Sequence, residues 1–351
     1  MGISPDREQA LQETAELIRL VRTILERIRP SSALPGDEDL TYPGFVAFTY
    51  AAQQSARTAK ADRDPRALDE RARQVTDGAR LSAGRARGCR CRSWPVDLTG
   101  PEAHLRESLV RALAALPRKP GTPPGPASMD IGQMDIGQME IGQMEIGQWR
   151  EDERDVFCAA GCLLAEVWPQ MLAEASLVVR QVALLAGLHI DGYTDFTTHG
   201  VVFINRRRLE PSRTGLPGSV RLAEALVHEG THNRFNVAAL SHPFLIDEVG
   251  QGAPALLATP LRSDPRPLSG LFQQLVVLVR SVSLYDRLLP SGAFDTSERH
   301  ALKVRRDVLR GQADQALATI QSQADALTGY GQELVAEAGD LLSQARSIPA
   351  A

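Results

Sequence analysis

The chain has 351 residues, of which 39 are basic and 43 acidic, so its formal net charge at neutral pH is only −4. A chain of this length can bury a full hydrophobic core, and its nearly balanced charge gives no reason to expect nucleic acid as a partner. No apolar run approaches the length of a membrane span and the first residues lack a secretory signal, so we expect a cytoplasmic protein that does not bind membranes.

The first region, residues 1–117, is predicted to be helical. Over residues 5–28, apolar residues recur every three or four positions, with acids early and arginines late, as in an amphipathic helix. Further helices are expected over residues 42–60 and 64–87. A fourth begins at a proline and covers residues 101–116.

The second region, residues 118–148, is predicted to be a linker that carries an internal repeat. Its first part is rich in proline and glycine, which favours extended backbone. Four tandem copies of the unit Met-[Asp/Glu]-Ile-Gly-Gln follow over residues 129–148. Because a glycine in every unit discourages a stable helix, we expect an exposed, flexible tract. Repeated short units are also typical of modified precursor peptides, which makes the tract a candidate substrate in cis; duplication within a tolerant linker is the alternative.

The third region, residues 149–351, is predicted to contain the catalytic machinery. We expect a helix over residues 151–185 that is broken at Pro169, and a short β-branched strand over residues 201–205. Two later helices are expected over residues 268–289 and 297–347. The whole chain is therefore predicted to be mainly α. More narrowly, we expect an α-rich α+β fold in which a bundle-like catalytic region has one short strand before its central helix.

The most informative feature is the run from His228 to His232, which has the pattern H-E-x-x-H. Two histidines four positions apart on a helix project from one face, about one turn apart, and can bind the same metal ion. Good helix formers precede the motif, and Ser219 is expected to cap the helix. Imidazole nitrogens suit zinc and iron(II) equally, so the pair does not choose the metal.

A second motif follows at residues 259–273, with the sequence TPLRSDPRPLSGLFQ. In its order and spacing after EALVHEGTHNRF, it resembles the HExxH-motif peptide-modification family over residues 190–290. Members of that family are iron(II)- and 2-oxoglutarate-dependent peptide β-hydroxylases found beside ribosomally synthesised, post-translationally modified peptides. The resemblance implies iron(II) and 2-oxoglutarate as cofactors and a precursor peptide as substrate and partner.

Roles for the remaining site residues follow from this resemblance and from their chemistry. Arg262 and Arg266 offer guanidinium groups suited to the far carboxylate of 2-oxoglutarate, and the family resemblance points to the same pair. A local turn network with a helix-capping role is the alternative for these arginines. Gln273 stands where the family shows histidine or glutamine, and we assign it to the cosubstrate. Glu248 is the candidate third metal ligand, and His242, which precedes Pro243 at an expected helix end, is the alternative.

Two other functions stay open at this point. In a zinc metallopeptidase of the H-E-x-x-H type, Glu229 would be the general base that activates water. In a non-catalytic peptide-binding partner, the motif would be vestigial. Release of succinate that depends on 2-oxoglutarate separates the hydroxylase from both alternatives, and a cleaved peptide identifies the peptidase.

Overall fold

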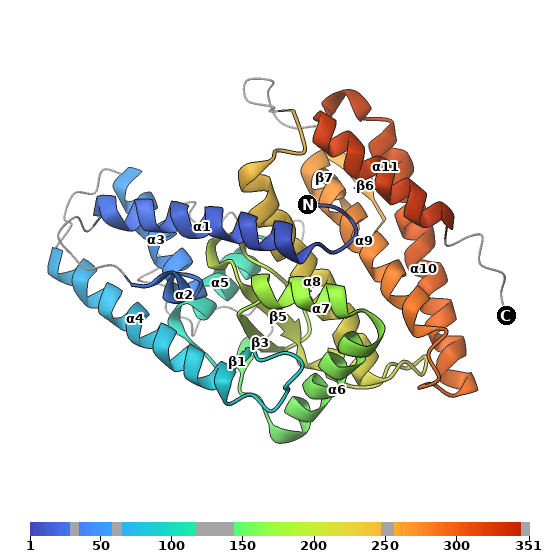
Figure 1. The fold of residues 1–351 in the computed structure, drawn as a ribbon, viewed down its shortest axis with the longest axis horizontal. Coiled ribbons are helices and arrows are strands. Elements are labelled where there is room, and N and C mark those ends of the chain that lie inside the picture. Colours follow the sequence, from blue (N-terminus) through green and yellow to red (C-terminus); the bar gives the residue numbers. More distant parts are fainter. Residues whose placement is uncertain (29–34, 58–64, 117–143, 247–255, 261, 345–351) are drawn as a thin grey trace, which may run out of the picture.

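The computed structural model describes residues 1–28, 35–57, 65–116, 144–246, 256–260 and 262–344. Within these ranges, eleven α-helices surround a small mixed sheet, which confirms the predicted α-rich α+β fold (Figure 1). The helices are α1 Arg7–Ile28, α2 Asp37–Leu40, α3 Pro43–Arg57, α4 Pro65–Arg87, α5 Ala103–Ala114, α6 Glu151–Val167, α7 Pro169–Val178, α8 Gly218–Ser241, α9 Leu268–Leu288, α10 Thr296–Gln321 and α11 Gly329–Gln344. The expected helix over 297–347 is thus two helices, with a short 3-10 turn, Ala324–Ala326, between them.

The central strand of the main sheet is β3, Gln181–Ala186. It pairs in parallel with β5, Val201–Asn205, along one edge. Its other edge is shared: β1, Asp97–Thr99, pairs in parallel with the first half, and β2, Glu145–Gly147, pairs antiparallel with the second half. The outermost strand, β4, Gly192–Tyr193, is antiparallel to β5. The strand predicted over residues 201–205 is therefore confirmed, but it belongs to a larger sheet than expected.

The predicted helix over residues 151–185 is wrong at its end, where β3 begins. Pro169 breaks the helix into α6 and α7 as expected, and α7 ends at Val178. The first five residues of β3 are all buried. A parallel strand covered on both faces has no alternation of apolar and polar residues, so its continuous apolar sequence resembles that of a buried helix.

The described residues of the three sequence regions share one sheet and one buried cluster with their neighbours. Met1, Ile3 and Trp94 belong to the same buried cluster as residues of α6 to α9, and β1 lies in the same sheet as β3 and β5. The last repeat copy contains β2, Glu145–Gly147, in which Ile146 is only 7% exposed. The expectation of an exposed tract is therefore wrong for the isoleucine of this copy, whereas Glu145 and Gln148 are exposed. The first three copies lie outside the described residues.

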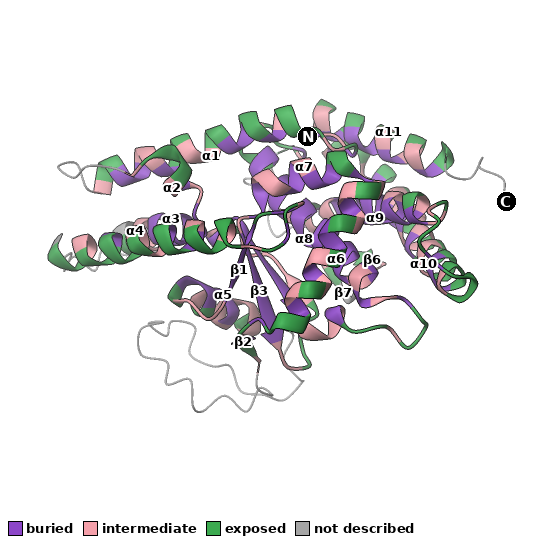
Figure 2. Cartoon of the chain, turned by 60° about the horizontal axis from the view of Figure 1, so that its bottom comes forward, coloured by how far each residue is buried: buried purple, intermediate pink, exposed green. Residues whose placement is uncertain are grey.

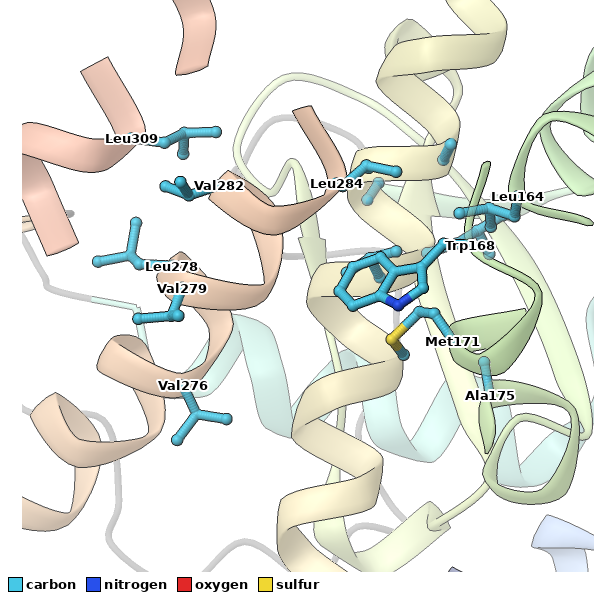
Figure 3. Close-up of a cluster of buried hydrophobic side chains, with 14 of the residues drawn as sticks. Leu164, Trp168, Met171, Ala175, Val276, Leu278, Val279, Val282, Leu284 and Leu309 are labelled. Atoms are coloured by element: carbon cyan, nitrogen blue, oxygen red, sulfur yellow. The ribbon is translucent and has the colours of Figure 1, made fainter. Parts of the chain in front are cut away.

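Helix α8 passes through the centre of the hydrophobic core. In Figure 3 it runs between α9 and the α6–α7 corner, with Leu278, Val279 and Val282 on one side and Trp168 and Met171 on the other. Strands β1, β3 and β5 of the main sheet are buried along nearly their whole length, whereas exposed residues gather on the outer faces of helices such as α1, α4 and α10 (Figure 2).

Helix α9 is long and apolar enough to cross a membrane by length and composition, contrary to our expectation that no such run exists. However, 72% of its most apolar window is buried inside the protein. This burial is typical of the core helix of a soluble protein and explains the apolar sequence without a membrane.

Candidate metal-binding site

The motif helix begins where two segments approach closely. Helix α8 starts at Gly218, its N-cap is Pro217, and no side chain caps it, so the predicted Ser219 cap is wrong. A β-carbon at Gly218 would collide with the carbonyl oxygen of Leu209, at the end of a short 3-10 turn. Only glycine allows this close approach. Because the helix already begins at Gly218, Ser219 lies inside it and cannot be its N-cap.

The two histidines of the motif lie together on α8. The ring centroids of His228 and His232 are 5.2 Å apart, with an angle of 62° between the rings. The His228 side chain remains 32% exposed. Burial, aided by the neighbouring His232, lowers the pKa of His228 to about 3, and burial also lowers the pKa of His232. Both imidazoles are therefore neutral at pH 7, which is the form that binds metal ions.

A hydrogen bond to α9 fixes the tautomer of His232. Its Nδ1 lies 3.0 Å from Oε1 of Gln273. An amide oxygen can only accept, so Nδ1 carries the proton and Nε2 keeps the lone pair that a metal ion would use. The structure thus places Gln273 against a candidate metal ligand. His232 contacts only the amide oxygen of Gln273. The predicted contact of Gln273 with the cosubstrate stays a prediction.

Glu229 is buried beside the histidine pair. Its side chain is 8% exposed, and Oε1 lies 4.0 Å from Nε2 of His228. A β-carbon at Gly192 of β4 would come within 2.9 Å of Oε1, so strand β4 covers this carboxyl group closely. Burial raises the pKa of Glu229 to about 8, although Arg208 opposes the shift.

The arrangement of these groups fits a cation. Oε2 of Glu229 is buried and has no hydrogen-bond partner among the described residues. A buried carboxyl group without a partner, next to two neutral imidazoles, has the donor chemistry that zinc or iron(II) requires. The set is nevertheless incomplete: within the described ranges, no group of three His, Cys, Asp or Glu residues is placed to hold a metal ion. Glu248, the predicted third ligand, lies outside those ranges.

The two arginines of the second motif lie on a strand. Strand β7, Arg262–Pro267, pairs antiparallel with β6, Leu256–Thr259, so the backbone at both arginines is extended. Their roles, with the turn network as the alternative, stay predictions. The backbone places Arg262 opposite Thr259 and Arg266 opposite Leu257. Because β7 runs directly into α9, Arg266 lies two residues before the helix, and Gln273, the residue that contacts His232, lies in the second turn of the helix. The second motif is thereby linked to the histidine pair through α9.

A buried network that was not predicted from the sequence lies before the motif. Glu224 lies one helical turn before His228; its Oε2 accepts hydrogen bonds from Tyr285 at 2.5 Å and from Arg305 at 3.0 Å. Burial alone would raise the pKa of Glu224, but its bonds with Arg305 outweigh this effect and lower it. The network joins α8 to α9 and α10.

A second network follows the motif. Asn233 donates to the carbonyl of Val201 at 3.0 Å, which ties α8 to β5. Arg234 is fully buried and forms ion pairs with Glu13 of α1 and Glu174 of α7. Arg280 of α9 joins the cluster at 2.6 Å from Glu174. No local pattern in the sequence predicted these contacts, because they join residues far apart in the chain.

No protein-family model matches this chain, and no curated protein matches it.

Proposed function

We propose that this protein is an iron(II)- and 2-oxoglutarate-dependent hydroxylase that modifies a ribosomally made peptide in the cytoplasm. One observation carries the proposal: α9 brings Gln273 against His232 and is entered directly from the strand that contains Arg262 and Arg266. A metal-binding pair and a basic motif for a dicarboxylate are thus joined by one helix. A peptidase has no evident use for the basic motif.

In this mechanism, His228 and His232 would hold the metal ion through their unprotonated nitrogens. Bound iron(II) would supply the chemistry by which 2-oxoglutarate and O2 are converted to succinate and CO2 while one oxygen atom enters a C–H bond of the peptide. Gln273 keeps the proton of His232 on Nδ1. Arg266 pairs with the far carboxylate of 2-oxoglutarate through a charge-assisted hydrogen bond. Glu229 lies buried beside His228 and holds a proton there while the site is free of metal.

A zinc metallopeptidase is the second candidate. The 4.0 Å separation between the Glu229 carboxyl group and Nε2 of His228 favours it, because a general base must lie next to metal-bound water. Burial favours the protonated form of Glu229 in the metal-free protein, so in the peptidase the bound zinc ion would have to stabilise its carboxylate. The peptidase mechanism also assigns no function to Arg262 and Arg266.

One set of incubations separates these functions. Protein loaded anaerobically with iron(II) is mixed with 2-oxoglutarate, O2 and candidate precursor peptides, and succinate and peptide mass are measured. The hydroxylase gives succinate together with a peptide heavier by one oxygen atom, and His232→Ala abolishes both. Cleaved peptide from zinc-loaded protein, without any need for 2-oxoglutarate, would replace the proposal with the peptidase. Peptide binding with neither product would indicate the non-catalytic partner.

A further inference from the structure

The last repeat copy, Met144–Gln148, is an integral part of the main sheet. As β2, it places Ile146 opposite Leu185 and Glu145 opposite Ala186. Ile146 is buried in an apolar cluster with Leu105, Leu109, Leu185 and Phe203, and Met144 packs against this cluster. The isoleucine and methionine of the unit therefore supply its apolar contacts with the sheet.

The other positions of the unit also have identifiable surroundings. Gly147 allows a close approach, since a β-carbon there would lie 2.9 Å from Nη2 of Arg206. That nitrogen donates to the carbonyl oxygen of Gln148 at 2.7 Å. The Gln148 side chain lies so close to Gly100 that a β-carbon at residue 100 would collide with it. Glu145, in contrast, is exposed.

The four copies differ only at this exposed position. The acid is aspartate at residues 130 and 135 and glutamate at residues 140 and 145, whereas Met, Ile, Gly and Gln are the same in every copy. Each copy thus contains all the side chains through which β2 contacts the rest of the protein. Because the varying side chain makes no buried contact, the substitution of aspartate for glutamate does not change what the edge of β3 would bind.

We propose that this edge of β3 is a docking site for the repeat unit itself, and that the copies within residues 129–143 exchange with Met144–Gln148 at it. An added strand gains its affinity from backbone hydrogen bonds and its specificity from alternate side chains, here Ile146. The chain is anchored just after the last copy, because Trp149 is buried and donates from Nε1 to the carbonyl of Val182 at 3.1 Å. Docking of residues 139–143 would leave one unit of five residues as a loop before Trp149, which is an ordinary loop length.

Disulfide trapping tests the exchange directly. Ala186→Cys is combined, in the full-length protein, with one of Glu145→Cys, Glu140→Cys, Asp135→Cys or Asp130→Cys, each of which would face residue 186 when its copy is docked. Loop-closure cost grows slowly with length, so we expect the Glu140→Cys pair to cross-link within about tenfold of the rate of the Glu145→Cys pair. Ser128→Cys, just outside the first copy, is the control. Peptide mapping distinguishes these links from the native cysteines.

The outcomes are distinct. If only Glu145→Cys cross-links, and Glu140→Cys reacts no faster than Ser128→Cys, the copies do not exchange. If the links form between molecules instead of within one, the occupant is a second copy of the chain, and the proposal of exchange within the chain is overturned.

A stability comparison provides an independent test. We expect Ile146→Ala to raise the unfolding equilibrium constant only a few-fold in the otherwise unchanged chain, because another copy replaces the damaged one. When Ile131, Ile136 and Ile141 are already alanine, no intact copy can replace the damaged one. In that background, Ile146→Ala should raise the unfolding equilibrium constant at least about thirtyfold, as for other buried isoleucines. The triple variant alone is the control and should unfold like the unchanged protein. An equal effect of Ile146→Ala in both backgrounds would rule out exchange.

Discussion

Gln273→Ala should weaken metal binding without loss of the fold. The substitution removes the acceptor 3.0 Å from Nδ1 of His232 and leaves that ring free to rotate and to change its tautomer. Gln273 is only half-buried on α9, so truncation opens no large cavity in the core. The expected effect is therefore on the metal ligand, not on the packing of the helix.

The size of the effect follows from the type of bond. Loss of a group that orients a metal-binding histidine typically lowers metal affinity by about ten- to a hundredfold. This corresponds to roughly 1.4–2.8 kcal/mol, which is within the range for a buried hydrogen bond whose partner is left unsatisfied. Gln273→Glu keeps an acceptor at this position, and its negative charge should preserve or strengthen metal binding.

Competition with a coloured chelator measures the affinity for zinc in each variant, and thermal unfolding reports the stability. Gln274→Ala is the matched control, because this neighbouring half-buried glutamine makes no bond to either histidine among the described residues. If Gln273→Ala binds zinc as tightly as the unchanged protein and Gln274→Ala, the bond to His232 does not orient a metal ligand. The assignment of α9 to the site would then lose its main support.

Three further predictions concern the same site. His228→Ala or His232→Ala should remove metal binding and leave most of the fold intact; unchanged metal content by elemental analysis in both variants would refute the site. Arg266→Ala should raise the 2-oxoglutarate concentration needed for half-maximal turnover about ten- to a hundredfold, while metal content stays the same; an unchanged concentration dependence would show that this arginine does not bind the cosubstrate. Glu229→Gln should stabilise the metal-free protein increasingly as the pH rises. The reason is that the folded protein keeps the Glu229 proton up to a pKa of about 8, whereas the unfolded chain loses it near 4.5, so unfolding is favoured between these values. Denaturation at several pH values should show the stability difference between variant and unchanged protein growing by about 3 kcal/mol from pH 5 to pH 8, and a constant difference would mean that Glu229 titrates normally.

The sequence predicted those parts of the site that depend on local periodicity. His228 and His232 are four positions apart in a helix-forming segment, so their common face followed from helix geometry alone. The bond from His232 to Gln273 joins residues 41 positions apart. Its existence depends on how α8 and α9 pack, which no local pattern encodes. The close contact of Glu229 with Gly192 could not be predicted either, because it depends on how β4 packs against α8.

The repeat shows a different limit of sequence reasoning. Glycine in every unit correctly argued against a helix, but it does not argue against a short edge strand, where it permits the approach of Arg206 to Gly147. β2 has only three residues and one buried side chain, too few to show alternation. The strand exists because β3 offers an open edge beyond β1, which is a property of the tertiary structure.

The buried charges around α8 explain how this helix keeps its histidines in place. Glu224 holds α8 against α9 and α10 before the motif, and Arg234 holds it against α1 and α7 after the motif. Buried ion pairs seldom add stability relative to apolar side chains, but a buried charge that loses its partner costs about 3–5 kcal/mol. A shift of α8 along its axis would separate both sets of partners at once. These charges therefore act against alternative registers, and the register they favour is the one in which His232 meets Gln273.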